Sequence, residues 1–375
     1  MHIILNINKY IQRKGDYIMG KINVALIFGG KSGEHEVSLL STSSIYKYID
    51  KEKYNVFTIG ITKDGKWMYY DGSPENIENG SWIDFVNKNV EINLIPSGNK
   101  EVGIIYEDGK TEKIDVLFPV LHGPYGEDGT IQGLFEMSEI PYVGCGVLAS
   151  SVGMDKIVCK KVFSQLGLPQ VNYTDTNRWL FNKDEKTELD LIEDKLEYPI
   201  FVKPANLGSS VGISKATNRE ELLNGIKEAL KYDSRIVLEQ GVNAKEIEVA
   251  VLGNEDVRAS IAGEIKPAKD FYDYEDKYIN GASTYEIPAN ISEDDMKNIR
   301  EMAIKAFKGI DGRGLSRVDF FIDRNSGEIF INEINTLPGF TNISMYPKMW
   351  DKTGLKYINL IDELIQLALD SKKLK

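Results

Sequence analysis

Two short apolar runs end directly in glycine-rich turns, and this feature constrains the fold more than any other. Residues 22–28 meet Gly29-Gly30, and residues 115–121 meet a turn that runs from His122 to Gly129. A pattern of helical spacing follows each turn. Strands that alternate with helices favour a parallel sheet, and such a sheet binds ligands at the carboxyl ends of its strands. We therefore predict an α/β fold with a ligand site at the two turns.

The remainder of the chain continues the alternation of strand and helix patterns and shows no internal repeat. The patterns predict a helix at 155–166, strands at 198–203, 236–239, 248–252, 316–322 and 329–334, and helices at 219–231, 293–307 and 355–369. The polar, aromatic-rich stretch 266–285 has the length of a lid over an active site. We predict a loose extension over 1–20, an N-terminal substrate-binding α/β domain over 21–154, a central domain over 155–244 and a C-terminal catalytic domain over 245–375.

Charge and composition exclude several classes of protein. Lysine and arginine total 45 against 57 acidic residues, and the net charge of −12 disfavours binding to nucleic acid or anionic lipid. No apolar stretch approaches the roughly 18 residues that cross a bilayer, and the N-terminus lacks the apolar run of a secretory signal. We expect a cytoplasmic protein with no nucleic-acid or membrane partner. Three histidines and two distant cysteines cannot form a structural zinc site, so a metal needs oxygen ligands.

A segment rich in glycine and serine follows the predicted strand that ends at Lys203. It is Gly-Ser-Ser-Val-Gly at residues 208–212. Glycines let backbone amides approach a polyphosphate, serine hydroxyls add donors, and a lysine adds positive charge. The segment lacks Gly-x-x-x-x-Gly-Lys-Ser/Thr and is therefore not a P-loop. Taken alone, it fits either a phosphate-binding loop or an ordinary polar hairpin loop.

Four polar residues fall on the last two predicted strands. Arg317 and Asp319 are two residues apart and share one face, as do Glu333 and Asn335, and a hairpin would bring the two pairs together. Mg²⁺ prefers one or two carboxylates with phosphate oxygens and water, so this set suits Mg²⁺ shared with a nucleotide. On spacing alone, an exposed polar hairpin face with a structural salt bridge fits as well.

The first glycine turn reads Gly-Gly-Lys-Ser-Gly-Glu-His-Glu-Val-Ser over residues 29–38. It lacks Gly-x-Gly-x-x-Gly, which lowers the case for a Rossmann cofactor. Glu34 and Glu36 stand where a helix begins, and the helix dipole favours negative charge there. A carboxylate at the carboxyl end of a strand can also hold a substrate ammonium group. Helix capping and substrate binding both remain open for Glu34 at this point.

Six motifs stand in one order along the chain. They begin at Gly29 (GGKSGEHEVS), His122 (HGPYGEDG), Met154 (MDK), Lys203 (KPANLGSSVG), Phe271 (FYDYEDKY) and Glu333 (EINTLPGF). Together they closely resemble the D-alanine–D-alanine ligases, a family of the ATP-grasp superfamily, over about residues 21–371. The resemblance implies the ATP-grasp fold, with three α/β domains: an N-terminal domain with a parallel sheet and two domains that sandwich ATP.

The resemblance also implies a reaction. ATP would phosphorylate the carboxylate of a first D-alanine, and the amine of a second D-alanine would attack the acyl phosphate to give D-alanyl-D-alanine for peptidoglycan precursors. ATP would be a substrate, and two Mg²⁺ or Mn²⁺ would neutralise charge on the phosphates. A homodimer is expected. Closure of the 266–285 lid would keep water from an acyl phosphate that hydrolyses easily.

The resemblance assigns roles to the residues at matching positions. For ATP these are Lys156 and Lys203 (α and β phosphates), Glu239 and Glu246 (adenine and ribose), Ser210 (the loop over the phosphates) and Lys277 (γ-phosphoryl group). For the metal ions they are Asp319, Glu333 and Asn335. For the two D-alanines they are Glu34 (first ammonium), His122 (first carboxylate), Arg317 and the backbone N–H of Gly339 (oxyanion), Ser344 (second carboxylate) and Met345 (second subsite). Glu34, Ser209 and Tyr278 would form a hydrogen-bonded triad that links the three domains.

Three other functions fit parts of the pattern. A ligase that joins D-alanine to D-serine or D-lactate would differ in its second substrate; we expect D-alanine, because no histidine lies within 266–285 and Tyr278 keeps a hydroxyl. Another ATP-grasp carboxylate–amine ligase would keep the metal-binding residues but need not carry Glu34, Ser209 and Tyr278 together. A nucleotide-binding regulator without turnover would be expected to lose the metal carboxylates or Arg317, and this chain retains them.

Overall fold

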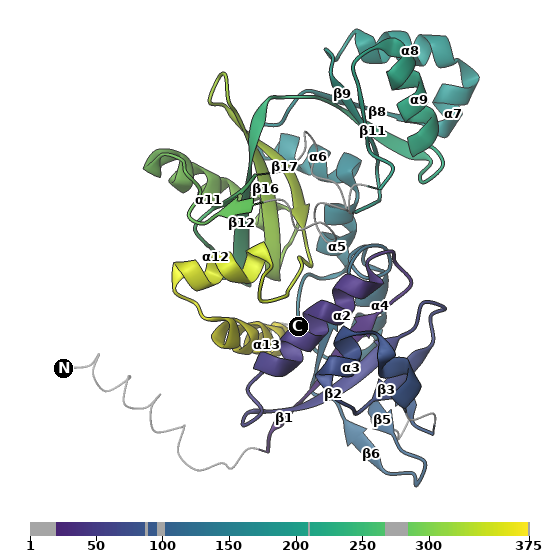
Figure 1. The fold of residues 1–375 in the computed structure, drawn as a ribbon, viewed down its shortest axis with the longest axis vertical. Coiled ribbons are helices and arrows are strands. Elements are labelled where there is room, and N and C mark those ends of the chain that lie inside the picture. The colour runs from purple at the N-terminus through teal and green to yellow at the C-terminus, as the bar shows by residue number, and fades with distance from the viewer. Residues whose placement is uncertain (1–19, 87–88, 96–101, 209–210, 267–283, 374–375) are drawn as a thin grey trace, which may run out of the picture.

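Four β-sheets organise the part of the chain that the computed structural model describes, which is residues 20–86, 89–95, 102–208, 211–266 and 284–373. Figure 1 shows the N-terminal sheet with a small sheet beside it at one end of the molecule, the sheet of the central region at the other end, and the C-terminal sheet between them. Most of the predicted lid at 266–285, and the predicted extension up to residue 19, lie outside the described residues.

The N-terminal sheet is mainly parallel, as the two glycine turns predicted. β1 (Ile22–Gly29) pairs in parallel with β2 (Tyr54–Ile61) on one side and with β7 (Val116–Val120) on the other, and β3 (Trp67–Tyr70) adds an antiparallel edge. The residues from Val24 to Phe28 are fully buried. Continuous burial is expected for a central parallel strand that is covered on both faces.

Helices follow the two glycine turns, and α2 packs on β1. A three-stranded antiparallel sheet, in the order β4–β5–β6, extends this end of the molecule. The remaining elements of this region are α2 (His35–Tyr48), α3 (Pro74–Glu78), a 3₁₀ helix (Ser81–Phe85), β4 (Glu91–Asn93), β5 (Gly103–Ile105), β6 (Thr111–Lys113), α4 (Thr130–Ser138) and α5 (Val147–Met154).

The central sheet is antiparallel and has the strand order β10–β9–β11–β8. Its helices α7, α8 and α9 gather on one side of the strands (Figure 1), and a core of its own fills the space between them. The elements are α6 (Lys156–Gln165), β8 (Tyr173–Asn177), α7 (Arg178–Lys183), α8 (Glu185–Glu193), β9 (Ile200–Pro204), β10 (Ser214–Ala216), α9 (Arg219–Ala229) and β11 (Arg235–Gln240).

The C-terminal sheet is also antiparallel, with the main order β15–β14–β12–β16–β17. In the β16–β17 hairpin Arg317 lies opposite Asn335 and Asp319 opposite Glu333, so the predicted juxtaposition of the two polar pairs is confirmed. The elements are β12 (Ala244–Gly253), β13 (Arg258–Ala259), β14 (Gly263–Lys266), β15 (Thr284–Glu286), α11 (Glu293–Gly309), β16 (Gly314–Asp323), β17 (Ile329–Asn335), α12 (Met345–Thr353) and α13 (Tyr357–Lys373).

Two hydrophobic cores join parts of the chain that are far apart in sequence. Val24 and Phe118 of the N-terminal sheet are buried in one cluster with Trp350 of α12 and Leu360 of α13, and Figure 1 shows α13 beside α2. A second cluster joins residues of α6 to the C-terminal sheet and α11. The domain boundaries that we predicted at 154–155 and 244–245 stay a prediction, and both cores contain residues from more than one predicted domain.

No helix in the described ranges is long and apolar enough to cross a membrane.

Candidate active site

The two glycine turns meet at the carboxyl ends of β1 and β7. The Ser32 hydroxyl donates to the His122 carbonyl at 2.6 Å and accepts from the Glu34 amide at 3.2 Å. A Cβ added to Gly123 would lie 2.5 Å from Glu34 Oε2, and one added to Gly208 would lie 3.5 Å from the same atom. The Glu34 carboxylate therefore sits between the second turn and the start of the glycine–serine loop, although Ser209 and Ser210 themselves lie outside the described residues.

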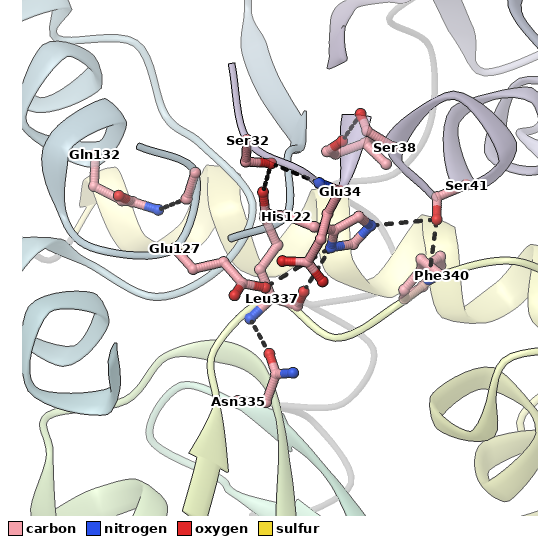
Figure 2. Close-up of polar contacts among 12 residues, drawn as sticks. Ser32, Glu34, Ser38, Ser41, His122, Glu127, Gln132, Asn335, Leu337 and Phe340 are labelled. Carbon is pink, nitrogen blue, oxygen red and sulfur yellow. Dashed lines mark hydrogen bonds and ion pairs between the residues drawn. The ribbon is translucent and has the colours of Figure 1, made fainter. Parts of the chain in front are cut away.

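His122 connects this edge to the loop after β17. Its Nδ1 lies 3.1 Å from the Leu337 carbonyl and 3.8 Å from Glu127 Oε1. Because a carbonyl only accepts, Nδ1 carries the proton and donates it. The Nε2 atom lies 3.3 Å from the Ser41 hydroxyl, which also accepts from the Phe340 amide at 3.4 Å. Figure 2 shows the turns, α2 and the loop meeting at this imidazole.

Burial and charge act in opposite directions on the pKa values of this pair. Burial lowers the pKa of His122, but the neighbouring Glu127 carboxylate outweighs it, and the net shift is upward. Burial raises the pKa of Glu127, and the neighbouring His122 imidazole offsets only part of that rise. The second turn thus holds a buried pair of titratable groups beside Glu34, and an imidazole there can meet an anionic substrate group.

The β16–β17 hairpin carries a compact set of charges. Arg317 donates from Nε to Asp319 Oδ1 at 2.7 Å and from Nη2 to Oδ2 at 2.6 Å, and its Nε lies 3.2 Å from Glu248 Oε1 on β12. Burial lowers the pKa of Arg317, but the two carboxylates raise it well above the usual value. The guanidinium is therefore a permanent buried cation at the centre of the hairpin face.

Asp319, Glu333 and Asn335 fit a magnesium ion by the chemistry of their donor atoms. They offer two carboxylates and one amide oxygen on paired strands, and the Asn335 oxygen accepts from the Leu337 amide at 3.2 Å. Across the described ranges no cluster of three or more His, Cys, Asp or Glu side chains could hold a metal by itself. A small protein donor set completed by phosphate oxygens and water is what Mg²⁺ prefers.

Four of the predicted ATP-binding residues lie on neighbouring elements: Lys156 on α6, Lys203 on β9, Glu239 on β11 and Glu246 on β12. Lys156 donates to the Leu207 carbonyl at 2.6 Å, and its Nζ lies 4.0 Å from Glu333 Oε2. Lys203 donates to Glu239 Oε2 at 2.6 Å. The pKa of Lys203 is raised; burial lowers it, but Glu239, with smaller contributions from Glu333 and Glu246, outweighs burial. The lysines assigned to the phosphates thus lie close enough to Glu333, assigned to the metal, for the charges to act on each other.

Glu239 is buried between two cations. Lys160 lies 2.8 Å from its Oε1 atom and Lys203 lies 2.6 Å from Oε2. Burial raises the pKa of Glu239, but the two lysines outweigh burial and lower it to about 2. Its carboxylate is ionised throughout the physiological range and acts as an acceptor only.

The loop from Thr336 to Ser344 brings Gly339 and Ser344 together. The Ser344 hydroxyl accepts from the Thr341 amide at 3.1 Å, and a Cβ added to Gly339 would lie 3.3 Å from Ser344 Oγ. Met345 opens α12, and a Cβ added to Gly263 would lie 2.4 Å from its terminal methyl group. Gly339, predicted for the oxyanion, therefore lies beside Ser344, predicted for the second substrate, on the loop whose Leu337 carbonyl His122 binds.

Two groups of predicted residues form continuous networks. One runs from Glu34 through His122 to the Leu337–Ser344 loop, and the other lies between the nucleotide lysines and the β16–β17 hairpin. Lys277 and Tyr278, like Ser209 and Ser210, lie outside the described residues, so their predicted roles stay predictions.

Our sequence reasoning missed four residues of these networks: Ser41, Glu127, Lys160 and Glu248. Two had a usable signal. Lys160 is four residues after Lys156, which puts the two lysines on one helix face, and Glu248 is two residues after Glu246 on a strand.

Two family models match most of the chain. The model described as D-ala D-ala ligase N-terminus matches residues 23–145, and the one described as D-ala D-ala ligase C-terminus matches residues 162–366. The chain belongs to the D-alanine–D-alanine ligase family. The resemblance on which the site residues were assigned is thereby confirmed, and the family consists of ATP-dependent ligases.

Curated relatives agree with the family models. The D-alanine–D-alanine ligase of Acetivibrio thermocellus is 50% identical over 361 residues, which is 93% of this chain and 96% of that protein. D-alanine–D-alanine ligase B of Clostridium tetani is 49% identical over 372 residues, 99% of this chain and all of that protein.

Solved structures of family members have the same fold. The VanG D-Ala:D-Ser ligase of Enterococcus faecalis is 37% identical with a TM-score of 0.83, covering 93% of this chain and all of that one. The D-alanine–D-alanine ligase of Coxiella burnetii is 35% identical with a TM-score of 0.82, covering 94% of this chain and 95% of that one. The predicted fold class, α/β of the ATP-grasp type, is confirmed.

Proposed function

We propose that this protein joins two D-alanine molecules into D-alanyl-D-alanine with ATP, through a D-alanyl phosphate, and so supplies peptidoglycan synthesis in the cytoplasm. One observation carries the proposal beyond family membership: the hydrogen bond from His122 to the Leu337 carbonyl. It joins the edge that carries Glu34 to the loop that carries Gly339 and Ser344. A ligase that couples two amino acids needs the subsite of the first amino acid, here assigned to Glu34, next to that of the second, here assigned to Ser344.

The first step of the reaction requires residues that bind the first D-alanine and residues that bind ATP. Glu34 holds the ammonium of the first D-alanine, and His122 lies at its carboxylate. Lys156 and Lys203 bind the phosphates of ATP, and Lys277 approaches the γ-phosphoryl group on which charge spreads. Fixed cations of this kind lower the barrier mainly through position and electrostatics.

The second step uses the hairpin and the following loop. When the second amine attacks the acyl phosphate, the carbonyl oxygen gains negative charge, and Arg317 and the Gly339 amide stabilise it. Ser344 binds the carboxylate of the second D-alanine, and Met345 lines its subsite. Phosphate leaves as the peptide bond forms.

Asp319, Glu333 and Asn335 would hold two Mg²⁺ or Mn²⁺ ions. Bound there, the ions would supply Lewis-acid neutralisation of charge on the transferred phosphoryl group. The residues nearby are consistent with this role, because Lys156 and Arg317 lie beside the same carboxylates. With the ions bound to these carboxylates, the Lys156 ammonium would be available to contact the phosphates and the Arg317 guanidinium to contact the substrate.

A second candidate function is a ligase that joins D-alanine to D-serine, because one similar solved structure bears that description. We favour D-alanine as the second substrate, since Tyr278 keeps a hydroxyl and no histidine lies within 266–285. We further propose that the enzyme is a homodimer, which sedimentation of the purified chain tests.

The deciding experiment is a competition. Purified protein is incubated with ATP, Mg²⁺ and equal amounts of D-alanine, D-serine and D-lactate at neutral pH, and products are identified by mass spectrometry. D-alanyl-D-alanine with ADP is the expected result. A mixed dipeptide or a depsipeptide as main product would change only the assignment of the second substrate. AMP with pyrophosphate would overturn the mechanism.

A further inference from the structure

Lys160 lies beside Lys203 at Glu239, and the assigned roles do not use it. Lys160 of α6 has only 2% of its side chain exposed, and its Nζ lies 2.8 Å from Glu239 Oε1. The same ammonium lies 5.1 Å from the centre of the Tyr173 ring. A buried cation between a carboxylate and an aromatic face is held in one place.

Glu239 shares one of its two lysines with the proposed phosphate site. Adenine needs a carboxylate oxygen that can accept from its 6-amino group, and each Glu239 oxygen faces one lysine. Lys203, the more exposed of the two lysines at 12% against 2%, is the one assigned to the phosphates. A turn of Lys203 toward the phosphates would clear space for the base at Oε2 and would leave Glu239 with Lys160 as its cation.

We propose that Lys160 is a positioning residue for nucleotide recognition: it stays on Glu239 Oε1 when Lys203 turns to the phosphates, and it keeps Oε2 ionised and aimed at the 6-amino group of adenine. This inference rests on the proposed function. Lys160 contacts the carboxylate and not the nucleotide, so it acts through Glu239.

Base selection follows from the charge that Lys160 maintains. An ionised carboxylate accepts hydrogen bonds and repels another acceptor, so it binds the 6-amino group of adenine and rejects the 6-oxo group of hypoxanthine. If Lys160 is removed and Lys203 turns to the phosphates, the buried Glu239 loses both of the lysines that pair with it among the described residues. Burial then favours the protonated acid, which can donate to a 6-oxo group.

The test compares Lys160→Met with Lys161→Met. Lys161 is the next residue of α6 and is exposed, so its variant changes the chain's charge equally without touching Glu239. Dissociation constants for ADP and IDP, measured without turnover, and KM values for ATP, ITP and D-alanine are obtained for both variants and the unaltered enzyme. In the absence of nucleotide, Lys203 still pairs with Glu239 in Lys160→Met, and thermal unfolding checks that this variant is folded.

We expect Lys160→Met to bind ADP at least tenfold more weakly and to lose most of the preference for ADP over IDP, with KM for D-alanine unchanged. Lys161→Met should match the unaltered enzyme. If Lys160→Met does not fold, Lys160→Gln, which removes the charge and keeps a donor, carries the same expectation.

An unchanged ADP-to-IDP ratio in the folded variant would overturn the role of Lys160. Failure of the unaltered enzyme to bind ADP at all would instead overturn the proposed function.

Discussion

Arg317 holds both carboxylate oxygens of Asp319, with Nε 2.7 Å from Oδ1 and Nη2 2.6 Å from Oδ2. Each carboxylate oxygen keeps a second lone pair, so Asp319 could coordinate a metal ion while it still accepts from Arg317. Glu248 lies 3.2 Å from Nε of the same guanidinium. Two carboxylates thus fix the orientation of Arg317 beside the proposed metal site.

Arg317→Lys should lower turnover by about 100-fold or more, the usual cost of one lost oxyanion donor. Lysine keeps the charge but cannot contact Asp319, Glu248 and a developing oxyanion with fixed planar donors. ADP and dipeptide formation are measured together, with Arg258→Lys as the control, since Arg258 pairs with Glu363 at a surface position. A kcat near that of the unaltered enzyme would remove Arg317 from the second step.

Glu333→Gln should lose most of its turnover and require more Mg²⁺ for what remains. The amide keeps the size of the side chain and weakens its hold on a divalent cation. The measurement is the rate of ADP formation across a Mg²⁺ titration. Glu328→Gln, on the exposed β16–β17 turn, serves as control, and ordinary turnover of Glu333→Gln at saturating Mg²⁺ would contradict the metal assignment.

Removal of His122 should change how stability depends on pH. The pKa of His122 is raised from 6.5 in the folded protein, so its contribution is complete below pH 6.5 and is lost as pH rises through the higher folded value. The gap in Tm between the unaltered protein and His122→Gln should narrow from about pH 6 to about pH 8. A gap that stays constant or widens contradicts the raised pKa of His122.

Neither cysteine should react with iodoacetamide in the native protein at about pH 8, because only the thiolate is nucleophilic. Burial raises the pKa of Cys145 and of Cys159 to about 12, and both thiols are 3% exposed. Mass spectrometry should find no label on the folded chain and two labels after denaturation. Rapid native labelling at either thiol would contradict the packing of its core.

Sequence patterns predicted the elements with strong periodicity and missed those defined by packing. The helix at 293–307 and the strands of the last hairpin were anticipated within about two residues. β8 was missed because Tyr173–Asn177 is mostly polar, and its pairing with β11 is visible only in three dimensions. Similarly, α7 and α8 are short, and few of their residues are buried.

Site residues could be predicted from the sequence when they lie on one face of a single strand or within a short motif. Arg317 and Asp319 share a face because strand side chains alternate. The contact of His122 with Leu337 joins positions 215 residues apart, and no local pattern encodes it. The link from Ser41 to Phe340 spans 299 residues. Buried serines and lysines carry the least local signal, because their role depends on what tertiary packing puts beside them.

The core shared by the N-terminal sheet and α13 has a consequence for synthesis. Val24 and Leu26 are synthesised long before Leu360 and Ile365, yet all four pack in the same cluster. The N-terminal sheet cannot bury its apolar surface on that side until α13 has been synthesised, whereas the central region, whose core is local in sequence, can fold while the chain is still growing. The substrate edge is thus completed only after α13 has emerged, and a chain truncated before Tyr357 should lack a stable substrate edge even though Glu34 and His122 are present.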